Sequence, residues 1–218
     1  RPMIVPDLSR AWAEIDLAAV RANVTAVREL VGLRVGVMAV VKANAYGHGL
    51  KEISRASVRA GADWLGVATI DEALAIRHEF PTTHVCLLSP FPTEAAEEIV
   101  VHRVLPLIGD LETARVLSVA AQRLRGSARV HVEIDTGMGR GGCAPRDAGK
   151  VAAVTARLPA IVISGCSTHF PSAEDDPAHT LQALAHLRIA CAAIEATDTP
   201  LKPVHCANSA ALLLYPDT

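Results

Sequence analysis

The sequence predicts an α/β fold built on a parallel sheet, and three observations support this prediction. Short runs rich in aliphatic and β-branched residues alternate with amphipathic stretches along the chain. The runs are almost continuously apolar, which is typical of parallel strands covered by helices. Of the 218 residues, 50% are hydrophobic and only 3% are aromatic, so the core must be mainly aliphatic. This length suits one domain with a large core.

Seven runs of this kind are expected to form strands. They cover residues 35–41, 64–68, 84–88, 103–108, 128–134, 160–167 and 203–206. Seven strands alternating with helices favour a (β/α)8 TIM-type barrel that is truncated before strand 8, and a doubly wound open sheet remains the alternative. We expect residues 1–218 to form a single barrel domain that is a fragment of a longer chain.

The first helix is expected over 17–31, because Asp16 is a good N-cap and apolar residues recur there on one face. In the last long helical stretch, Leu181, Leu184 and Leu187 keep a similar spacing. The further helices are predicted at 50–60, 71–79, 93–100, 111–123, 145–157, 177–195 and, as a short segment, 209–214.

Composition and charge exclude several classes of function. The formal net charge is -2, and no basic stripe is interleaved with aromatic residues, so nothing supports nucleic-acid binding. No apolar run approaches the length of a membrane span, and residues 1–6 do not resemble a signal peptide. We therefore expect a cytoplasmic protein that has no membrane partner.

The five cysteines are scattered, odd in number and without a C-x-x-C pair. Cys86, Cys166 and Cys206 fall in predicted strands, where a thiol behaves as a small apolar group. A metal site formed by Cys166, His169, His205 and Cys206 is conceivable, but this spacing matches no familiar ligand pattern. No metal is predicted.

The most informative segment is 42–49, Lys-Ala-Asn-Ala-Tyr-Gly-His-Gly, which directly follows the apolar run 38–41. A run rich in β-branched residues that ends in a turn with two glycines predicts a buried strand. Lys42 would be the last side chain of that strand, at the rim of the sheet. A half-desolvated lysine at such a rim can lose its proton near neutral pH and attack a carbonyl carbon. The alternative is a lysine that only extends to water.

This segment resembles the lysine motif of the alanine racemases, which are fold-type III pyridoxal-phosphate (PLP) enzymes. Four further segments resemble this family in the same order. They are Ala11-Trp12-Ala13-Glu14-Ile15-Asp16-Leu17, Asp135-Thr136-Gly137-Met138-Gly139-Arg140, Ser167-Thr168-His169-Phe170 and Ala207-Asn208-Ser209-Ala210-Ala211. The matches cover almost the whole chain. The resemblance implies that an eighth strand and a mainly β second domain follow residue 218.

The predicted strands would bring the candidate residues to one mouth of the barrel, because catalytic groups gather where strands end. By resemblance, Lys42 would carry PLP as a Schiff base, and Arg140 would lie near the cofactor's phenolic oxygen and the substrate carboxylate. His169 would support an arginine of the eighth strand that hydrogen-bonds the pyridine nitrogen of PLP. A planar guanidinium suits a carboxylate because the pair forms two hydrogen bonds. The cofactor-binding set implied by the resemblance is Lys42, Val40, Tyr46, Leu88, His169, Asn208 and Ser209, with the last near the phosphate.

One position departs from the family pattern. Two residues before Asp135, many members carry a lysine that carbon dioxide converts to a carbamate, which holds the arginine through its negative charge. Here the residue is Glu133, which is already acidic. Our hypothesis is that Glu133 pairs directly with Arg140 and removes the need for carbamylation.

The resemblance implies a racemase that interconverts L- and D-alanine and supplies D-alanine for peptidoglycan. It also implies a homodimer in which a tyrosine from the partner's second domain is the other acid–base group. Two alternatives stay open. One is a non-catalytic single-barrel protein that binds PLP and manages its supply, and the other is a decarboxylase on the same barrel.

Overall fold

The computed structural model describes residues 11–215, so the expectation for residues 1–6 lies outside the described part of the chain. Within these described residues, seven parallel strands form one sheet in the order β1-β2-β3-β4-β5-β6-β7. The strands are β1 (Met38–Val40), β2 (Trp64–Val67), β3 (His84–Leu87), β4 (Leu105–Ile108), β5 (Ala128–Glu133), β6 (Ile161–Ser167) and β7 (Val204–His205). The α/β class and the strand order are therefore as predicted.

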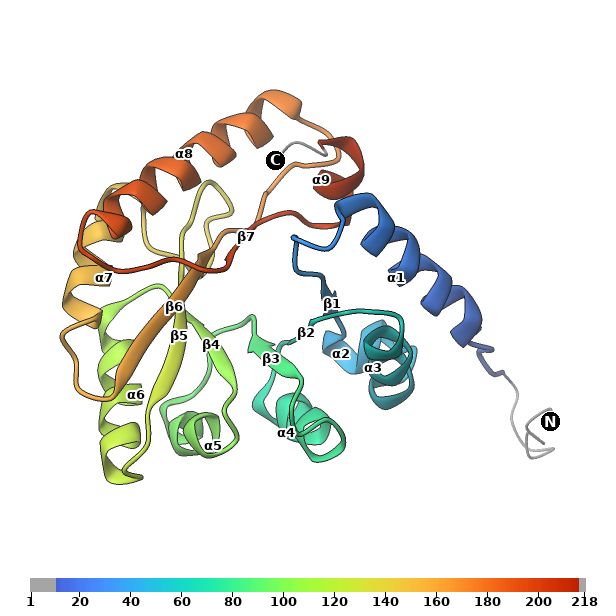
Figure 1. The fold of residues 1–218 in the computed structure, drawn as a ribbon, viewed down its shortest axis with the longest axis horizontal. Coiled ribbons are helices and arrows are strands. Elements are labelled where there is room, and N and C mark those ends of the chain that lie inside the picture. Colours follow the sequence, from blue (N-terminus) through green and yellow to red (C-terminus); the bar gives the residue numbers. More distant parts are fainter. Residues whose placement is uncertain (1–10, 216–218) are drawn as a thin grey trace.

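The helices alternate with the strands. They are α1 (Leu17–Val31), α2 (Lys42–Tyr46), α3 (Leu50–Arg59), α4 (Ile70–Glu79), α5 (Ala96–Val101), α6 (Leu111–Arg123), α7 (Ala148–Thr155), α8 (Pro177–Glu195) and α9 (Ser209–Leu214), with single 3-10 turns at Thr93–Ala95 and Pro145–Asp147. Figure 1 shows α3 to α8 following one another along the outer side of a curled sheet. In the described part of the chain, no helix has the length and apolar character of a membrane span.

The curvature makes a half-barrel and not a closed barrel. Each strand pairs only with its neighbours in the chain, and in residues 11–215 β1 and β7 are the two edges of the sheet. The predicted (β/α)8 architecture is thus present as seven consecutive units. A doubly wound sheet is wrong, because such a sheet reverses its strand order at a switch point, whereas this order runs without reversal.

Apolar side chains of the strands pack on both faces of the sheet, because successive side chains of a strand point to opposite faces. Val85 and Leu87 belong to the large cluster between the sheet and the outer helices. Cys86 packs with Leu105 and Leu107 in a smaller cluster, which also receives side chains from β1 and β2. The second cluster therefore lies on the concave face of the sheet.

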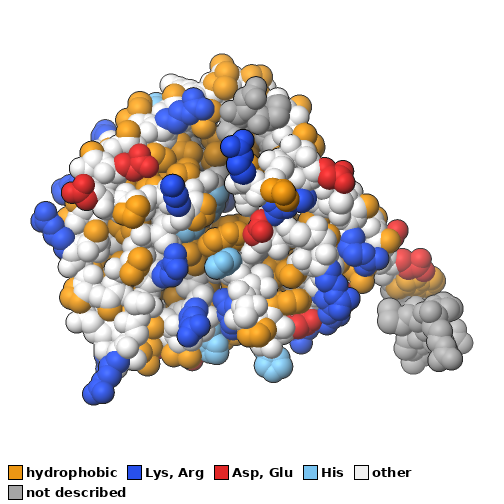
Figure 2. Space-filling model, viewed as in Figure 1, with side chains coloured by type: hydrophobic (Ala, Val, Ile, Leu, Met, Phe, Trp, Pro, Cys, Tyr) orange, Lys and Arg blue, Asp and Glu red, His pale blue; other side chains and the backbone are white. Residues whose placement is uncertain are grey.

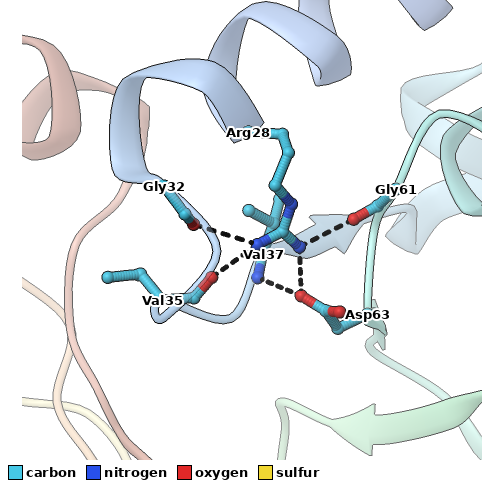
Figure 3. A network of polar contacts seen from close by, with 6 residues as sticks. All are labelled: Arg28, Gly32, Val35, Val37, Gly61 and Asp63. Atoms are coloured by element: carbon cyan, nitrogen blue, oxygen red, sulfur yellow. Dashed lines mark hydrogen bonds and ion pairs between the residues drawn. The ribbon is translucent and has the colours of Figure 1, made fainter.

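Strand β1 is shorter than predicted, since residues 35–37 lie in a loop instead of the sheet. Arg28 of α1 fixes this loop (Figure 3). Its guanidinium donates hydrogen bonds to the carbonyl oxygens of Val35 at 2.6 Å and Gly61 at 2.7 Å and forms an ion pair with Asp63. The Asp63 carboxylate also accepts a bond from the Val37 N–H at 2.8 Å. One arginine thus joins α1, the approach to β1 and the turn before β2.

Candidate active site

Lys42 lies directly after the buried Val41, where the chain leaves β1, and its side chain is half-buried. The next four residues, 43–46, all have φ between 52° and 55°, so the segment labelled α2 winds in the left-handed sense. Left-handed backbone is uncommon for residues other than glycine, and a run of four requires support from the surroundings. The predicted turn is present, but its helical sense was not foreseen.

Asn44 and Glu72 provide that support. The Asn44 side-chain oxygen accepts a hydrogen bond from the N–H of Leu50 at 2.8 Å, and the Asn44 N–H donates to the Glu72 carboxylate at 3.1 Å. Glu72 also completes a capping box with Thr69 at the start of α4. Neither Asn44 nor Glu72 was predicted to have this role, although the spacing of Thr69 and Glu72 is the known signature of a capping box.

Arg140 lies at the end of a loop that Asp135 folds. The Asp135 carboxylate accepts hydrogen bonds from the backbone N–H groups of Gly137 and Gly139 at 3.0 Å and of Arg140 at 2.8 Å. Although partial burial raises the pKa of Asp135, these donors lower it more, so the net pKa lies below its usual value. The loop is held beside the end of β6, where the hydroxyls of Thr136 and Thr168 lie 2.7 Å apart.

Two glycines near this loop are required by close backbone approach. A Cβ added at Gly142 would lie 2.4 Å from the Asp135 nitrogen, and one at Gly109 would lie 2.0 Å from the Gly141 carbonyl oxygen. Such contacts with backbone atoms cannot be relieved by a rotamer change. Glycine is therefore needed at these two positions, because the loop folds back against the protein's own backbone.

The three candidate catalytic residues share one electrostatic environment. Burial lowers the pKa of His169, and the positive charges of Arg140 and Lys42 lower it further, while Glu174 opposes them. His169 follows β6, Arg140 follows β5 and Lys42 follows β1, so all three lie at the carboxyl ends of parallel strands. Figure 2 shows that one face of the molecule is hollowed, with hydrophobic and histidine side chains visible in the hollow and several Lys and Arg side chains around it.

Glu133 ends β5 close to the Arg140 loop. Its carboxylate oxygen would lie 3.1 Å from a Cβ at Gly141, the residue next to Arg140. Burial raises the pKa of Glu133, and the charge of Arg140 partly offsets this effect. Among the described residues, however, the ion pairs do not include Glu133 with Arg140. The expected ion pair between Glu133 and Arg140 is therefore not formed, and the two residues interact only through the electrostatic effect of their charges. The Glu133 carboxylate lies instead against the backbone of Gly141.

The side chains of Val40 and Leu88 both lie close to Gly66, and their place in a cofactor pocket stays a prediction. Gly66 of β2 lies between them, and a Cβ there would be 2.8 Å from the Leu88 side chain and 3.4 Å from that of Val40. The missing side chain at Gly66 lets the two residues approach each other on the concave face.

The remaining predicted cofactor residues lie on the two edge units of the sheet. Asn208 caps α9 by accepting a hydrogen bond from the Ala211 N–H at 2.9 Å, and Ser209 is the first residue of that helix. Tyr46 ends the left-handed turn after β1 and is 60% exposed. An ordinary helix cap is therefore present in this segment, and Asn208 provides it.

A pair of histidines crosses the concave face beneath the site, and the sequence did not reveal it. His131 Nδ1 of β5 lies 2.9 Å from His205 Nε2 of β7. A Cβ at Gly165 of β6 would lie 2.9 Å from His131 Nε2, so glycine leaves the space for this contact. Desolvation lowers the pKa of His131 to about 3 and that of His205 to about 4. The pair is therefore neutral near pH 7 and braces the two-residue strand β7.

This pair predicts a loss of stability in mild acid. Both folded pKa values lie below the unfolded value of about 6.5, so the unfolded chain binds more protons once the pH falls below that value. We expect the unfolding free energy to fall between pH 6.5 and 4, by up to about 1.4 kcal/mol per pH unit for each histidine. Urea unfolding at pH 7.5, 6 and 5 measures this slope. The double variant His131→Gln/His205→Gln should flatten it, whereas His78→Gln, an exposed control, should leave it unchanged.

Among residues 11–215, no group of three or more His, Cys, Asp or Glu side chains suits a metal ion. Cys206, which was expected inside a strand, lies just after β7.

Comparison with known proteins agrees with this arrangement. The family model described as alanine racemase, N-terminal domain, matches residues 15–218. An alanine racemase of Symbiobacterium thermophilum is 37% identical over 208 residues, covering 94% of this chain and 55% of the relative. One of Desulfovibrio desulfuricans is 38% identical over 207 residues, with 94% and 56% covered.

Solved structures give the same result. An alanine racemase of Clostridium difficile 630 superposes with a TM-score of 0.92 at 29% identity, covering 97% of this chain and 56% of the other. One of Streptomyces coelicolor A3(2) has a TM-score of 0.87 at 35% identity, with 94% and 55% covered. The chain thus spans about half the length of the relatives it matches. On the family match and the shared fold, this chain belongs to the alanine racemase family, in which it corresponds to the N-terminal domain.

Proposed function

We propose that this chain is the cofactor-binding half of a PLP-dependent alanine racemase that interconverts L- and D-alanine. The observation that carries the proposal is the single electrostatic environment shared by Lys42, Arg140 and His169 at the carboxyl ends of three strands. Supply of D-alanine for peptidoglycan, a cytoplasmic location and a homodimer belong to the same proposal. They rest on the family alone.

The residues present fit PLP. Lys42 offers an amine at the strand end for the cofactor aldehyde, and Val40 and Leu88 offer an apolar wall on the concave face. His169 has a lowered pKa and is therefore a neutral hydrogen-bonding group near pH 7. Tyr46, Asn208 and Ser209 are the candidates for holding the phosphate. When bound, PLP supplies an electron sink for the charge left on Cα when its proton departs.

The protein's own groups would bind and orient alanine and move its proton. Arg140, presented by the Asp135 loop, would hold the carboxylate through two hydrogen bonds. The Lys42 amine would take or return the Cα proton on one face of the substrate. Inversion needs a second acid–base group on the opposite face. The chain has two tyrosines, Tyr46 and Tyr215, and we assign that role to neither, but to a tyrosine in the second domain of the partner subunit.

The direct test supplies the full-length gene product with PLP and L-alanine and follows the formation of D-alanine. The proposal predicts D-alanine that depends on added PLP. Saturable PLP binding without D-alanine would contradict it in favour of a non-catalytic PLP carrier. Release of carbon dioxide from an amino acid would instead favour a decarboxylase.

Glu133 provides a sharper test of the role of Arg140. Because the Glu133 carboxylate lies against Gly141 and interacts with the charge of Arg140, we propose that it positions the Arg140 loop, so Glu133→Gln should weaken the binding of alanine. We expect KM to rise roughly tenfold, equivalent to about 1.4 kcal/mol, with a smaller change in kcat.

Added bicarbonate tests whether Glu133 takes the place of the carbamate found in other members of the family. It should not restore the Gln variant, whereas the Glu133→Lys variant should recover with bicarbonate if a carbamate replaces the lost carboxylate. A Gln variant with unchanged KM would show that Glu133 does not support Arg140.

A further inference from the structure

Two thiols meet between the sheet and its outer helices, away from the candidate active site. Cys166 of β6 and Cys191 of α8 place their sulfur atoms 3.3 Å apart, although they are 25 residues apart in sequence. All five cysteines are free in the structure. Cys166 is fully buried on the outer face of β6, whereas Cys191 is partly exposed. Cys191 is therefore the more accessible residue of the pair.

The distance between the two sulfur atoms is short enough for a disulfide to form after a small movement. An S–S bond measures about 2.05 Å, so the sulfur atoms need to approach by little more than about 1 Å. The contact is a thiol–thiol hydrogen bond. That bond lowers the pKa of Cys191, and the same bond together with burial raises the pKa of Cys166. The partly exposed Cys191 is thus the better nucleophile, and Cys166 retains the proton.

The other thiols provide a contrast within the same chain. Burial raises the pKa of Cys86 to about 12 and that of Cys143 to about 11. Neither has a thiol hydrogen-bond partner among the described residues. Cys206 lies near enough to Cys191 to interact electrostatically, but the thiol hydrogen bond selects Cys166.

We propose that Cys166 and Cys191 form a reversible redox pair that hydrogen peroxide, or a related hydroperoxide, converts to a disulfide between β6 and α8. The Cys191 thiolate attacks one peroxide oxygen, the O–O bond breaks, and the departing hydroxide is protonated to water. This leaves a sulfenic acid on Cys191. The Cys166 sulfur then attacks the Cys191 sulfur, the S–O bond breaks, and the Cys166 proton leaves with the hydroxide as a second water. The two thiols lose two electrons, which reduce one peroxide to two waters.

The resulting bond would join the strand that leads to His169 to the helix that covers it, because Cys166 lies three residues before His169. The pair does not depend on the racemase activity. Its test therefore remains informative whether or not D-alanine is formed.

The experiment treats the reduced full-length protein with a small molar excess of hydrogen peroxide, blocks the remaining thiols and maps the peptides by mass spectrometry. We expect one disulfide between Cys166 and Cys191, reversible by dithiothreitol, with Cys86 and Cys143 still available for alkylation after denaturation. A Cys191–Cys206 linkage, or oxidation of Cys86 and Cys143 as fast as that of Cys191, would overturn the proposal.

Variants test the order of the steps. In Cys166→Ser, Cys191 should stop at the sulfenic acid and be trapped by dimedone, because its resolving thiol is absent. In Cys191→Ser, Cys166 should remain reduced, since it is fully buried. The control Cys143→Ser should form the disulfide as the wild type does. Peroxide-dependent labelling of Cys166 in Cys191→Ser would contradict the assigned roles.

Discussion

Lys42→Ala should abolish the covalent attachment of PLP and lower racemisation by roughly four orders of magnitude or more, because one amine is proposed to carry both the cofactor and a catalytic proton. Lys42 is the half-buried side chain that follows β1, and its charge, together with that of Arg140, lowers the pKa of His169. Borohydride reduction of the PLP-saturated protein, followed by peptide mapping, should place the label on the peptide that contains residue 42. The variant should carry no label there.

Lys51→Ala is the matched control. This lysine lies nine residues further along the chain, on α3, and is exposed. Its removal should change neither labelling nor racemisation. A label on Lys51, or a Lys42→Ala protein that keeps most of its activity, would refute the assignment of the amine.

Arg28→Ala should lower the free energy of unfolding by about 3 kcal/mol, since it removes several hydrogen bonds to a charged donor at once. The carbonyl oxygens of Val35 and Gly61 and the Asp63 carboxylate would lose their common partner (Figure 3). Asp63 would also lose the charge that, together with the Val37 N–H, lowers its pKa against the effect of burial. Equilibrium unfolding in urea measures the change.

Two further variants isolate the geometry from the charge. Arg28→Lys retains the charge but cannot contact both carbonyl groups with a planar fork, so it should recover less than half of the loss. Arg21→Ala, on an exposed position of the same helix, should stay within about 0.5 kcal/mol of the wild type. An Arg28→Ala protein as stable as the Arg21→Ala protein would show that the network contributes little.

Sequence periodicity predicted the regular elements well. The bounds of α1, α6, α8 and α9 are those expected, because each has a continuous apolar spacing and begins at a side-chain cap. The position of Lys42, Arg140 and His169 at strand ends followed from the same order of strands. Parallel strands that alternate with helices bring their carboxyl ends to one side, so the order of the strands in the sequence is enough to group these residues.

Features set by long-range contacts could not be predicted in this way. The loop before β1 looks like a strand in its composition, but Arg28 and Asp63 take the hydrogen bonds that a neighbouring strand would have taken. The contact between His131 and His205 joins residues 74 apart and depends on the missing side chain at Gly165. The position of the Glu133 carboxylate against Gly141, and not on Arg140, depends on how the glycine loop folds back.

The left-handed backbone of residues 43–46 is a conformation that suits D-amino acids better than L-amino acids. A left-handed conformation costs an L-residue about 1–2 kcal/mol, so residues 43–46 together hold roughly 4–8 kcal/mol. That sum is comparable with the whole folding free energy of a domain, about 5–15 kcal/mol. Mirror-image alanine at positions 43 and 45, introduced by chemical ligation, would prefer the observed geometry. In the natural chain, this cost is offset by the favourable free energy of buried contacts elsewhere in the fold. Core substitutions far from Lys42 can therefore change the position of its amine.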